Sequence, residues 1–325
     1  MRARVLHWAR FAFARQEIAA ALGQRADVAF EQVETLDAVL ARIDDTDMLI
    51  TTDVPAAEAH ALLDRLGRAP RRLAAVHFNS AGREGFEAAG LGALKGLCVT
   101  SGAEELAPTV AEHALALLLA LFRRLPEAMD AQRRRVWDAA ALPPRRTLHG
   151  ATLLVVGMGN IGHAVAERAA AFGSRVLAVT RTPAGRPAAC PVAGLDALEQ
   201  LLPEADAVIL CIALAPGTRH LIDAAALARM RPGAVLVNVG RGGLVDEGAL
   251  ARALQSGRLG GAGLDVTDPE PPPGESALWD VPGLILTSHV AATGGSTPQR
   301  LAGRAAAAVD AFVATVADRP RGTTR

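Results

Sequence analysis

The stretch LLVVGMGNIG, residues 153–162, decides the fold of this chain. Four apolar residues typical of a buried strand are followed by three glycines. Gly157 permits a tight turn, Gly159 lets the backbone approach a pyrophosphate, and Gly162 lets the next helix pack closely on its strand. A helix at 163–172 and a second strand at 175–179 follow. This order predicts a dinucleotide-binding unit; glycines that serve only a turn in another α/β sheet are the alternative.

The composition narrows the class of protein. With 325 residues the chain suits two domains, and its net charge of +0 gives no indication of nucleic acid, a membrane surface or a polyanionic partner. Cys98, Cys190 and Cys211 lack metal-ligand spacing, so no metal is predicted, and we expect Cys98 and Cys211 in the core. This cysteine usage favours a reducing, cytoplasmic location. The longest apolar run, residues 114–122, is too short to span a bilayer.

Residues 1–98 predict a smaller α/β domain. Strands are expected at 4–8, 28–30, 48–51 and 73–78, and helices at 16–22, 36–43 and 56–66. The segment NSAG, residues 79–82, directly follows the last of these strands, so its backbone N–H groups could form an anion-binding nest. An ordinary turn is the alternative.

The second half of the chain predicts a complete doubly wound parallel sheet. Six strands separated by crossover helices are expected at 153–156, 175–179, 207–212, 235–239, 261–266 and 284–287. A long helix is expected at 108–125, with Pro108 at its start. The basic segment 133–146 is either a solvated connector or an arm against a partner subunit. A final helix at 300–316 is expected to pack on the first domain.

Polar residues after the later strands are the candidates for chemistry, because ligands bind beyond the carboxyl ends of such strands. Arg241, Glu270 and His289 each follow a predicted strand. Reduction of a 2-keto acid needs a cation for the carboxylate, a proton donor for the carbonyl oxygen, and a carboxylate that keeps this donor protonated. Arginine, histidine and glutamate fill these roles. Taken singly, a surface arginine, a loop charge and a core histidine are the alternatives.

Together these motifs resemble the D-isomer-specific 2-hydroxyacid dehydrogenase family, which includes glyoxylate/hydroxypyruvate reductases and phosphoglycerate dehydrogenases. The resemblance covers nearly the whole chain. The segments that carry it are VAEHALALLLAL (110–121), GMGNIG (157–162), ARMRPGAVLVNVGRGGLVDEGALARAL (228–254), GAGLDVTDPEP (261–271) and LILTSHVAAT (284–293). It implies a Rossmann-type sheet, residues 100–291, inserted into a smaller flavodoxin-like substrate domain made of residues 1–99 and 292–325.

The resemblance also implies roles for single residues. Arg241 would bind substrate, Glu270 would orient His289, and His289 would act as acid and base. Backbone N–H groups near Ala81 and Gly82 would meet the substrate carboxylate. A homodimer formed through residues 105–148 is implied as well.

The expected cofactor is a nicotinamide dinucleotide, whose carboxamide Asp265 would hold by resemblance. An enzyme that reads the ribose hydroxyls of NAD has a carboxylate about twenty residues past the glycines, where this chain has Thr180, Arg181 and Thr182. A cation and two hydroxyls suit the 2′-phosphate, so we favour NADP over NAD; stacking of Arg181 on adenine is the alternative. The predicted cofactor-binding residues are Gly157, Gly159, Asn160, Ile161, Gly162, Thr180, Arg181, Thr182, Cys211, Val239, Gly240 and Asp265.

The sequence departs from the family pattern at two places. Ser288 precedes His289 where proline is usual, and the substrate loop contains Arg83 and Glu84. Arg83 is either a further charge contact for substrate or an ordinary surface arginine. We therefore expect an oxidoreductase that interconverts small 2-keto and 2-hydroxy acids such as glyoxylate or hydroxypyruvate. The alternative is a dinucleotide-sensing, corepressor-like binding protein with the same fold.

Overall fold

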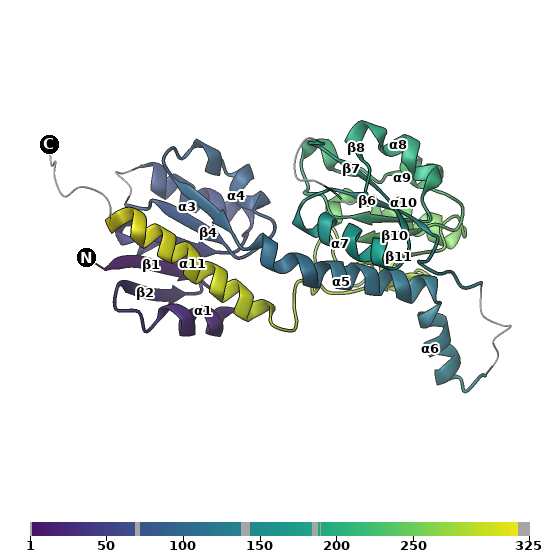
Figure 1. Ribbon diagram of the computed structural model, residues 1–325, viewed down its shortest axis with the longest axis horizontal. Helices are drawn as coiled ribbons and strands as arrows, with labels where there is room; N and C mark the ends of the chain where they lie inside the picture. The colour runs from purple at the N-terminus through teal and green to yellow at the C-terminus, as the bar shows by residue number, and fades with distance from the viewer. Residues whose placement is uncertain (1, 69–71, 138–143, 184–187, 189, 318–325) are drawn as a thin grey trace. The chain divides into compact units, whose positions relative to one another are not determined.

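The chain folds into two compact units, and Figure 1 shows the computed structural model that contains them. The structure describes residues 2–68, 72–137, 144–183, 188 and 190–317. The first unit consists of Met1–Leu106 with Thr293–Arg325, and the second of Ala107–Ala292. From the sequence we placed the domain changes at 99/100 and 291/292. Parts of the predicted arm at 133–146 and of the segment 292–325 lie outside the described residues.

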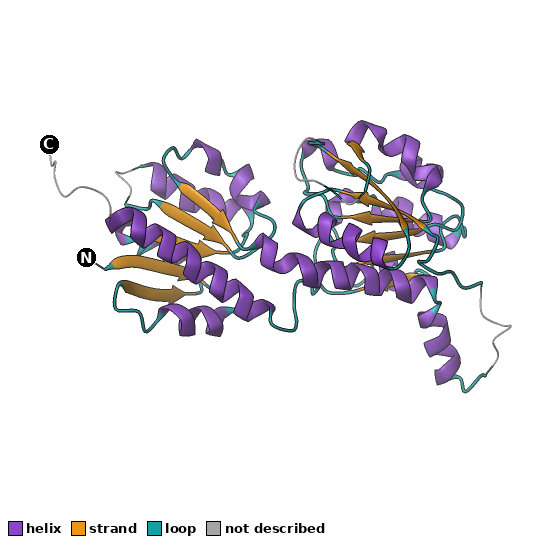
Figure 2. Ribbon diagram, viewed as in Figure 1, coloured by secondary structure: helices purple, strands orange, loops and turns teal. Residues whose placement is uncertain are grey.

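A five-stranded parallel sheet forms the centre of the first unit (Figure 2). Its order, β2-β1-β3-β4-β5, is the flavodoxin-like order. The strands are β1 (Ala3–Trp8), β2 (Val28–Val33), β3 (Met48–Thr51), β4 (Ala75–Phe78) and β5 (Cys98–Ser101). Successive side chains of a strand point to opposite faces, so Leu6, Leu49 and Val76, which are paired in register, line one face together.

Helices complete the first unit. Its helices and short 3-10 turns are α1 (Arg15–Leu22), α2 (Leu36–Leu40), η1 (Ile43–Asp45), α3 (Ala56–Gly67), α4 (Glu84–Ala88), η2 (Leu91–Ala93) and α11 (Thr297–Ala317). Val39 of α2, Leu62 of α3 and Phe86 of α4 join the core on the face that carries Leu6. Helix α11 packs against α1, β3 and β4, and so belongs to the first unit.

A seven-stranded parallel sheet forms the centre of the second unit. Its order is β12-β11-β10-β9-β6-β7-β8, which from β8 to β11 is the Rossmann order 3-2-1-4-5-6. The strands are β6 (Thr152–Val156), β7 (Arg175–Thr180), β8 (Val192–Gly194), β9 (Ala207–Leu210), β10 (Val235–Asn238), β11 (Gly261–Leu264) and β12 (Leu284–Leu286). The strand order reverses between β6 and β9, and ligands bind beyond the carboxyl ends of strands at such a point.

The second unit also contains most of the longer helices. Its helices and short turns are α5 (Ala103–Phe122, which begins in the first unit), α6 (Leu125–Arg133), α7 (Asn160–Ala171), η3 (Leu195–Ala197), α8 (Leu198–Leu201), η4 (Leu202–Glu204), η5 (Pro216–Thr218), α9 (Ala224–Arg229), η6 (Gly242–Leu244), α10 (Glu247–Gln255) and η7 (Ala277–Trp279). The core between sheet and helices is built from leucine, valine and alanine side chains of β6, β9, β10 and α10.

Two edge strands were missed by the sequence prediction. The second sheet has β8 in addition to the six predicted strands, and the first sheet has β5. Both are short, pair on one side only, and have no fully buried residue, so they lack the apolar signal of a central strand. For the same reason the expectation that Cys98 lies in the core was wrong: Cys98 begins β5 and is exposed.

Helix α5 begins earlier than predicted. It starts at Ala103 and contains Pro108 in its interior, where we expected this proline at the start. The signal that was overlooked is Ser101, whose Oγ accepts a hydrogen bond of 3.0 Å from the N–H of Ala103. A serine at this place satisfies one of the free N–H groups of the first turn, so the helix can begin before the proline.

Helix α5 packs directly on the second sheet. A Cβ on Gly263 would lie 3.0 Å from Leu117 Cβ, and a Cβ on Gly261 would lie 2.9 Å from Leu121 Cδ2, so the glycines of β11 allow the close approach. Among the described residues α5 is long and apolar enough to cross a membrane, but 56% of its most apolar window is already buried in the protein. The burial is that of a core helix.

Two histidines are buried in the first sheet. His7 of β1 and His77 of β4 are 3% and 0% exposed. Their Nδ1 atoms lie 3.0 Å from Gln32 Oε1 and 2.8 Å from Thr100 Oγ1. Burial is the main cause that lowers the pKa of His7 and of His77 to about 4, so both rings are neutral at pH 7.

These histidines predict a loss of stability in weak acid. An unfolded histidine is protonated near its ordinary pKa of 6.5, whereas these two are protonated only near 4 in the folded chain. The unfolded state therefore binds more protons between these values, and stability falls as the pH drops from about 6.5 towards 4. We expect a loss of about 2 kcal/mol for each histidine between pH 7 and pH 5.

Thermal unfolding measured between pH 7.5 and 5 checks this prediction. His77→Leu should flatten the pH dependence of Tm, because it removes one of the two titrating rings. His60→Leu, which replaces an exposed histidine of α3, is the matched control and should leave the dependence unchanged. Equal slopes for the two variants would contradict the prediction.

Candidate active site

The glycine turn between β6 and α7 is set by close backbone contacts. Gly157 has a φ of 103°, and a Cβ there would lie 2.7 Å from the backbone nitrogen of Ile212. A Cβ on Gly162 would lie 1.9 Å from the carbonyl oxygen of Gly157, so α7 can approach the turn only with glycine at this position. Around Gly159, by contrast, nothing lies within 4 Å of the place of a Cβ. The turn is thus closed on the protein side and open on the other.

The open side of this turn fits an anion. Gly159 and Asn160 are exposed at the N-terminus of α7, and Ile161 is half-buried. The first N–H groups of a helix have no partner within the helix, and the positive end of its dipole favours negative charge. The turn can therefore hold the pyrophosphate of a dinucleotide.

Residues after β7 and β9 continue the predicted cofactor region. Thr180 ends β7, and Arg181 and Thr182 follow it with exposed side chains. None of these three residues is acidic. Cys211 follows β9, and its N–H donates to Val156 O at 2.8 Å beside the glycine turn. Burial raises the pKa of the Cys211 thiol to about 12, so it is a neutral packing group.

Arg241 projects from a tight turn after β10. The side chain of Asn238 holds this turn at both ends: its Nδ2 donates to Arg241 O at 2.9 Å, and its Oδ1 accepts from Gly240 N at 3.0 Å. Val239 is buried, and a Cβ on Gly240 would lie 2.9 Å from Ile212 O. The strand end and its asparagine therefore fix the backbone of Arg241, whose guanidinium donates to Gly240 O at 2.8 Å.

His289 and Glu270 are in direct contact. His289 Nδ1 lies 2.7 Å from Glu270 Oε1, with 46% and 42% of the two side chains exposed. Glu270 comes from the loop after β11 and His289 from the loop after β12, and these strands are neighbours in the sheet. Because Glu270 occupies Nδ1, the ring nitrogen that can serve a ligand is Nε2.

Asp265 holds the loop that carries His289. Its carboxylate is 1% exposed and accepts hydrogen bonds from Thr287 Oγ1 at 2.5 Å, Val290 N at 3.0 Å and Ala291 N at 2.9 Å. Its carbonyl oxygen accepts a further bond of 2.8 Å from His289 N. His289 has a φ of 54°, a left-handed conformation that is uncommon for a side chain of this size. The bonds to Asp265 hold the backbone in this conformation.

His113 of α5 contacts this site, although it was not among the predicted site residues. Its Nε2 lies 3.0 Å from Thr287 Oγ1 and 3.4 Å from Asp265 Oδ1, although α5 is far from β11 in the sequence. Burial alone would raise the pKa of Asp265, but hydrogen bonds from His113, Thr287 and the backbone outweigh it and lower this pKa. The only sequence signal was a polar side chain within an apolar helix.

The loop at 79–85 belongs to the first unit, and Asp53 and Ser80 define its shape. Ser80 Oγ accepts from Asp53 N at 3.0 Å and donates to Gly82 O at 2.6 Å, while the Asp53 carboxylate accepts from Gly85 N at 3.1 Å. Arg83 Nε donates to Glu87 Oε1 at 2.8 Å, so this guanidinium is paired on the surface of α4. Substrate binding by Ala81 and Gly82 stays a prediction from the resemblance.

The comparison with known families identifies the second unit. Residues 115–291 match the family described as D-isomer specific 2-hydroxyacid dehydrogenase, NAD binding domain. D-3-phosphoglycerate dehydrogenase of Mycobacterium tuberculosis is 34% identical over 283 residues, which cover 86% of this chain and 52% of that protein. Glycerate dehydrogenase of Methylorubrum extorquens is 38% identical over 213 residues, 63% of this chain and 65% of the relative. The chain thus spans about half the length of the mycobacterial relative.

Solved structures share the whole fold. NADPH-dependent glyoxylate/hydroxypyruvate reductase of Sinorhizobium meliloti, in complex with NADP and malonate, has a TM-score of 0.79 at 29% identity, with 97% of this chain and 95% of that chain covered. D-lactate dehydrogenase of Aquifex aeolicus, complexed with NAD and lactic acid, has a TM-score of 0.75 at 24% identity, with 98% of each chain covered. The second likeness concerns the fold alone.

The glycine turn predicts different effects on Tm for two alanine substitutions that both impair dinucleotide binding. Gly162→Ala forces a shift of the backbone, because its Cβ would lie 1.9 Å from Gly157 O; we expect a lower Tm and loss of dinucleotide binding. Gly159→Ala meets no protein atom within 4 Å, so Tm should stay while the Cβ obstructs the phosphate and weakens binding at least about tenfold.

Thermal unfolding and titration of NADPH and NADH fluorescence measure both quantities. Gly217→Ala, a further glycine with nothing within 4 Å of the place of its Cβ, serves as the control. Unchanged dinucleotide affinity in Gly159→Ala would show that the pyrophosphate binds elsewhere.

Proposed function

The chain belongs to the D-isomer specific 2-hydroxyacid dehydrogenase family, and we propose that it is an oxidoreductase that transfers a hydride between NADPH or NADH and a small 2-keto or 2-hydroxy acid. Glyoxylate and hydroxypyruvate are the proposed substrates, in line with the names of relatives from Sinorhizobium meliloti and Thermotoga maritima. The observation that carries the proposal is the 2.7 Å contact between His289 Nδ1 and Glu270 Oε1, beside the turn that holds Arg241.

In the proposed reaction each of the three residues has one task. The guanidinium of Arg241 binds the substrate carboxylate, for which its planar, permanently charged group is suited. A reduced nicotinamide, when bound beside this site, would supply the hydride for the keto carbon. As the hydride adds, the electron pair of the C=O bond moves onto the oxygen. His289 donates its Nε2 proton to this oxygen, which gives the hydroxyl group, and is left as a neutral imidazole. Glu270 stabilises the protonated ring before the transfer and keeps its orientation.

Removal of the proton donor is the direct test of this assignment. His289→Ala should lower kcat with glyoxylate or hydroxypyruvate by about 10²- to 10⁴-fold, the usual contribution of general acid catalysis. Dinucleotide affinity should stay, because the turn at 157–162 is untouched. Stopped-flow turnover and fluorescence titration give the two numbers, with His149→Ala, at an exposed histidine, as the control. Full turnover in His289→Ala would remove this residue from the proposed mechanism.

We infer that NADP is preferred over NAD. The support is the sequence Thr180-Arg181-Thr182 after β7, with a cation and two hydroxyls where an NAD enzyme has a carboxylate. The Sinorhizobium meliloti relative is described as NADPH-dependent, and its described complex contains NADP. The exposed Arg181 side chain can meet the 2′-phosphate at the carboxyl end of the strand.

The preference for NADP predicts a selective loss on removal of Arg181. Arg181→Gln should raise the KM for NADPH about tenfold and leave the KM for NADH unchanged, since only NADPH has the 2′-phosphate. Arg175→Gln alters an exposed arginine at the opposite end of β7, paired with Glu204, and should change neither value. If the unmodified protein used NADH as efficiently as NADPH, or more efficiently, the preference for NADP would be contradicted.

A cytoplasmic homodimer completes the proposal. Free cysteines at positions 98, 190 and 211 support a reducing compartment. Tight dinucleotide binding without turnover on a panel of 2-keto acids would instead favour the corepressor-like alternative.

A further inference from the structure

The loops that carry Arg241 and Glu270 leave neighbouring strands side by side. Asn238 at the end of β10 is paired in register with Leu264 at the end of β11. The turn at 239–245, here called the Arg241 turn, follows β10, and residues 265–271, here called the Glu270 loop, follow β11. If the proposed reaction is correct, the relative position of these two segments decides how the substrate carboxylate lies with respect to His289.

The two segments touch through their backbones. A Cβ on Gly242 would lie 2.0 Å from the carbonyl carbon of Thr267 and 2.6 Å from Asp268 N. A Cβ on Gly243 would lie 3.1 Å from Asp268 Oδ2 and 2.9 Å from an Arg219 terminal nitrogen. The Glu270 loop therefore rests directly on the Arg241 turn, with no side chain from the turn between them.

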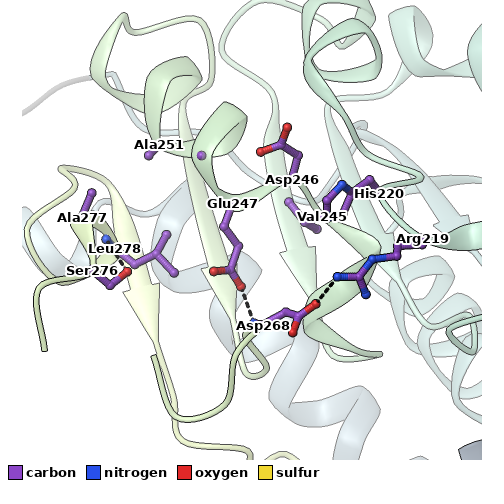
Figure 3. Close-up of a pocket in the computed structure, with 11 residues that line it drawn as sticks. Arg219, His220, Val245, Asp246, Glu247, Ala251, Asp268, Ser276, Ala277 and Leu278 are labelled. Carbon is purple, nitrogen blue, oxygen red and sulfur yellow. Dashed lines mark hydrogen bonds and ion pairs between the residues drawn. The ribbon is translucent and has the colours of Figure 1, made fainter. Parts of the chain in front are cut away.

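Charged side chains connect the two segments (Figure 3). Asp268 N donates to Glu247 Oε1 at 2.7 Å, and Arg219 donates from a terminal guanidinium nitrogen to Asp268 Oδ2 at 2.8 Å. Glu247 is the first residue of α10, just after the Arg241 turn. Arg219 precedes His220, whose N–H donates to Gly243 O at 2.8 Å. Both partners of Asp268 are thus anchored to the Arg241 turn.

The positive charge of Arg219 supports the close approach of the Glu247 and Asp268 carboxylates. Glu247 and Asp268 are two carboxylates in close proximity, and burial, with the charge of Asp268 as a further cause, raises the pKa of Glu247. The positive charge of Arg219 offsets the repulsion. With 55% of Arg219 and 40% of Asp268 exposed, the ion pair is screened by solvent and adds little to the stability of the whole fold.

Solvent rather than packed side chains borders the loop on the other side. Asp268 lines an open cavity of about 490 Å³ together with the three residues 276–278, and Figure 3 shows Arg219, Glu247 and Asp268 at its edge. On the side of this cavity, apolar packing does not determine where the Glu270 loop lies. The polar contacts of Asp268 have that role.

We propose that Arg219, Asp268 and Glu247 are positioning residues that lock the Glu270 loop onto the Arg241 turn. Glu270 follows Asp268 by two residues, so a displacement of Asp268 moves the carboxylate that orients His289. The three residues contact neither the glycine turn at 157–162 nor His289. Their effect passes through Glu270 and through the backbone of Arg241. This inference rests on the proposed 2-keto acid reduction.

The test compares four variants in the full-length protein. Arg219→Gln leaves the two carboxylates unbalanced, and Asp268→Asn, which keeps the backbone donor, removes the ion pair from the other side. R219Q/E247Q removes the charge of Glu247 while its amide oxygen can still accept from Asp268 N. Arg229→Gln is the matched control, because Arg229 pairs with Glu199 at 3.2 Å and is 54% exposed in the same unit.

We expect Arg219→Gln to lower kcat/KM for glyoxylate or hydroxypyruvate about tenfold, as small displacements of reacting groups do. Asp268→Asn removes the repulsion together with the ion pair, so it should stay within about threefold of the unmodified protein. The loss should appear in kcat more than in KM, because a displaced Glu270 no longer holds the ring of His289 in place for the proton transfer. Tm and NADPH affinity should equal those of Arg229→Gln. R219Q/E247Q should recover to within about threefold of the unmodified protein.

Two results would overturn the inference. One is kinetics for Arg219→Gln that match those of Arg229→Gln, and the other is the absence of recovery in R219Q/E247Q relative to Arg219→Gln. If Arg219→Gln does not fold, Asp268→Asn and R219Q/E247Q decide, because a tenfold loss in either of them would contradict the balance of charges. Absence of turnover in the unmodified protein would instead reject the proposed function, so the two failures are distinguishable.

Discussion

The carboxylate of Asp265 is the interaction on which the geometry of the candidate site depends. It lies at the carboxyl end of a central strand, is almost completely buried, and accepts hydrogen bonds from a hydroxyl and two backbone N–H groups of the loop after β12. A buried carboxylate is costly unless such donors satisfy it. Because the donors come from the loop itself, the loop cannot move without leaving the charge unsatisfied, and His289 stays in its left-handed conformation.

Close backbone contacts have a similar role elsewhere in the second unit. Gly162 lies against Gly157 and Gly242 against Thr267 at separations that exclude a Cβ, and Gly263 lies close to the side chain of Leu117. Each contact joins a loop or helix to the carboxyl side or the face of the sheet. The glycine turn at 157–162, the Arg241 turn and α5 are therefore fixed in position relative to the strands. Charged side chains then adjust the loops that these contacts leave partly free.

Sequence reasoning located the central strands and the functional turns because their signals are local. A buried parallel strand is recognised in the sequence as an apolar run, and a turn whose backbone requires glycine is recognised by the glycine itself. It failed at β5 and β8, which are short edge strands without such a run, and at the start of α5, which begins at Ala103 beside the Ser101 hydroxyl and not at Pro108. It also assigned Cys98 to the core, since an apolar neighbourhood in sequence does not tell which side of an edge strand faces solvent.

By itself the sequence determined the α/β class, the positions of Arg241, Glu270 and His289 after successive strands, and the absence of an acid after β7. Only the tertiary structure decided which side chains meet. The contact of His113 with Asp265 joins residues 152 positions apart, and that of Arg219 with Asp268 joins residues 49 apart. Such pairs depend on strand order and on the paths of long loops. The period of a strand or helix carries no information about them, because it reports only which face of one element is buried.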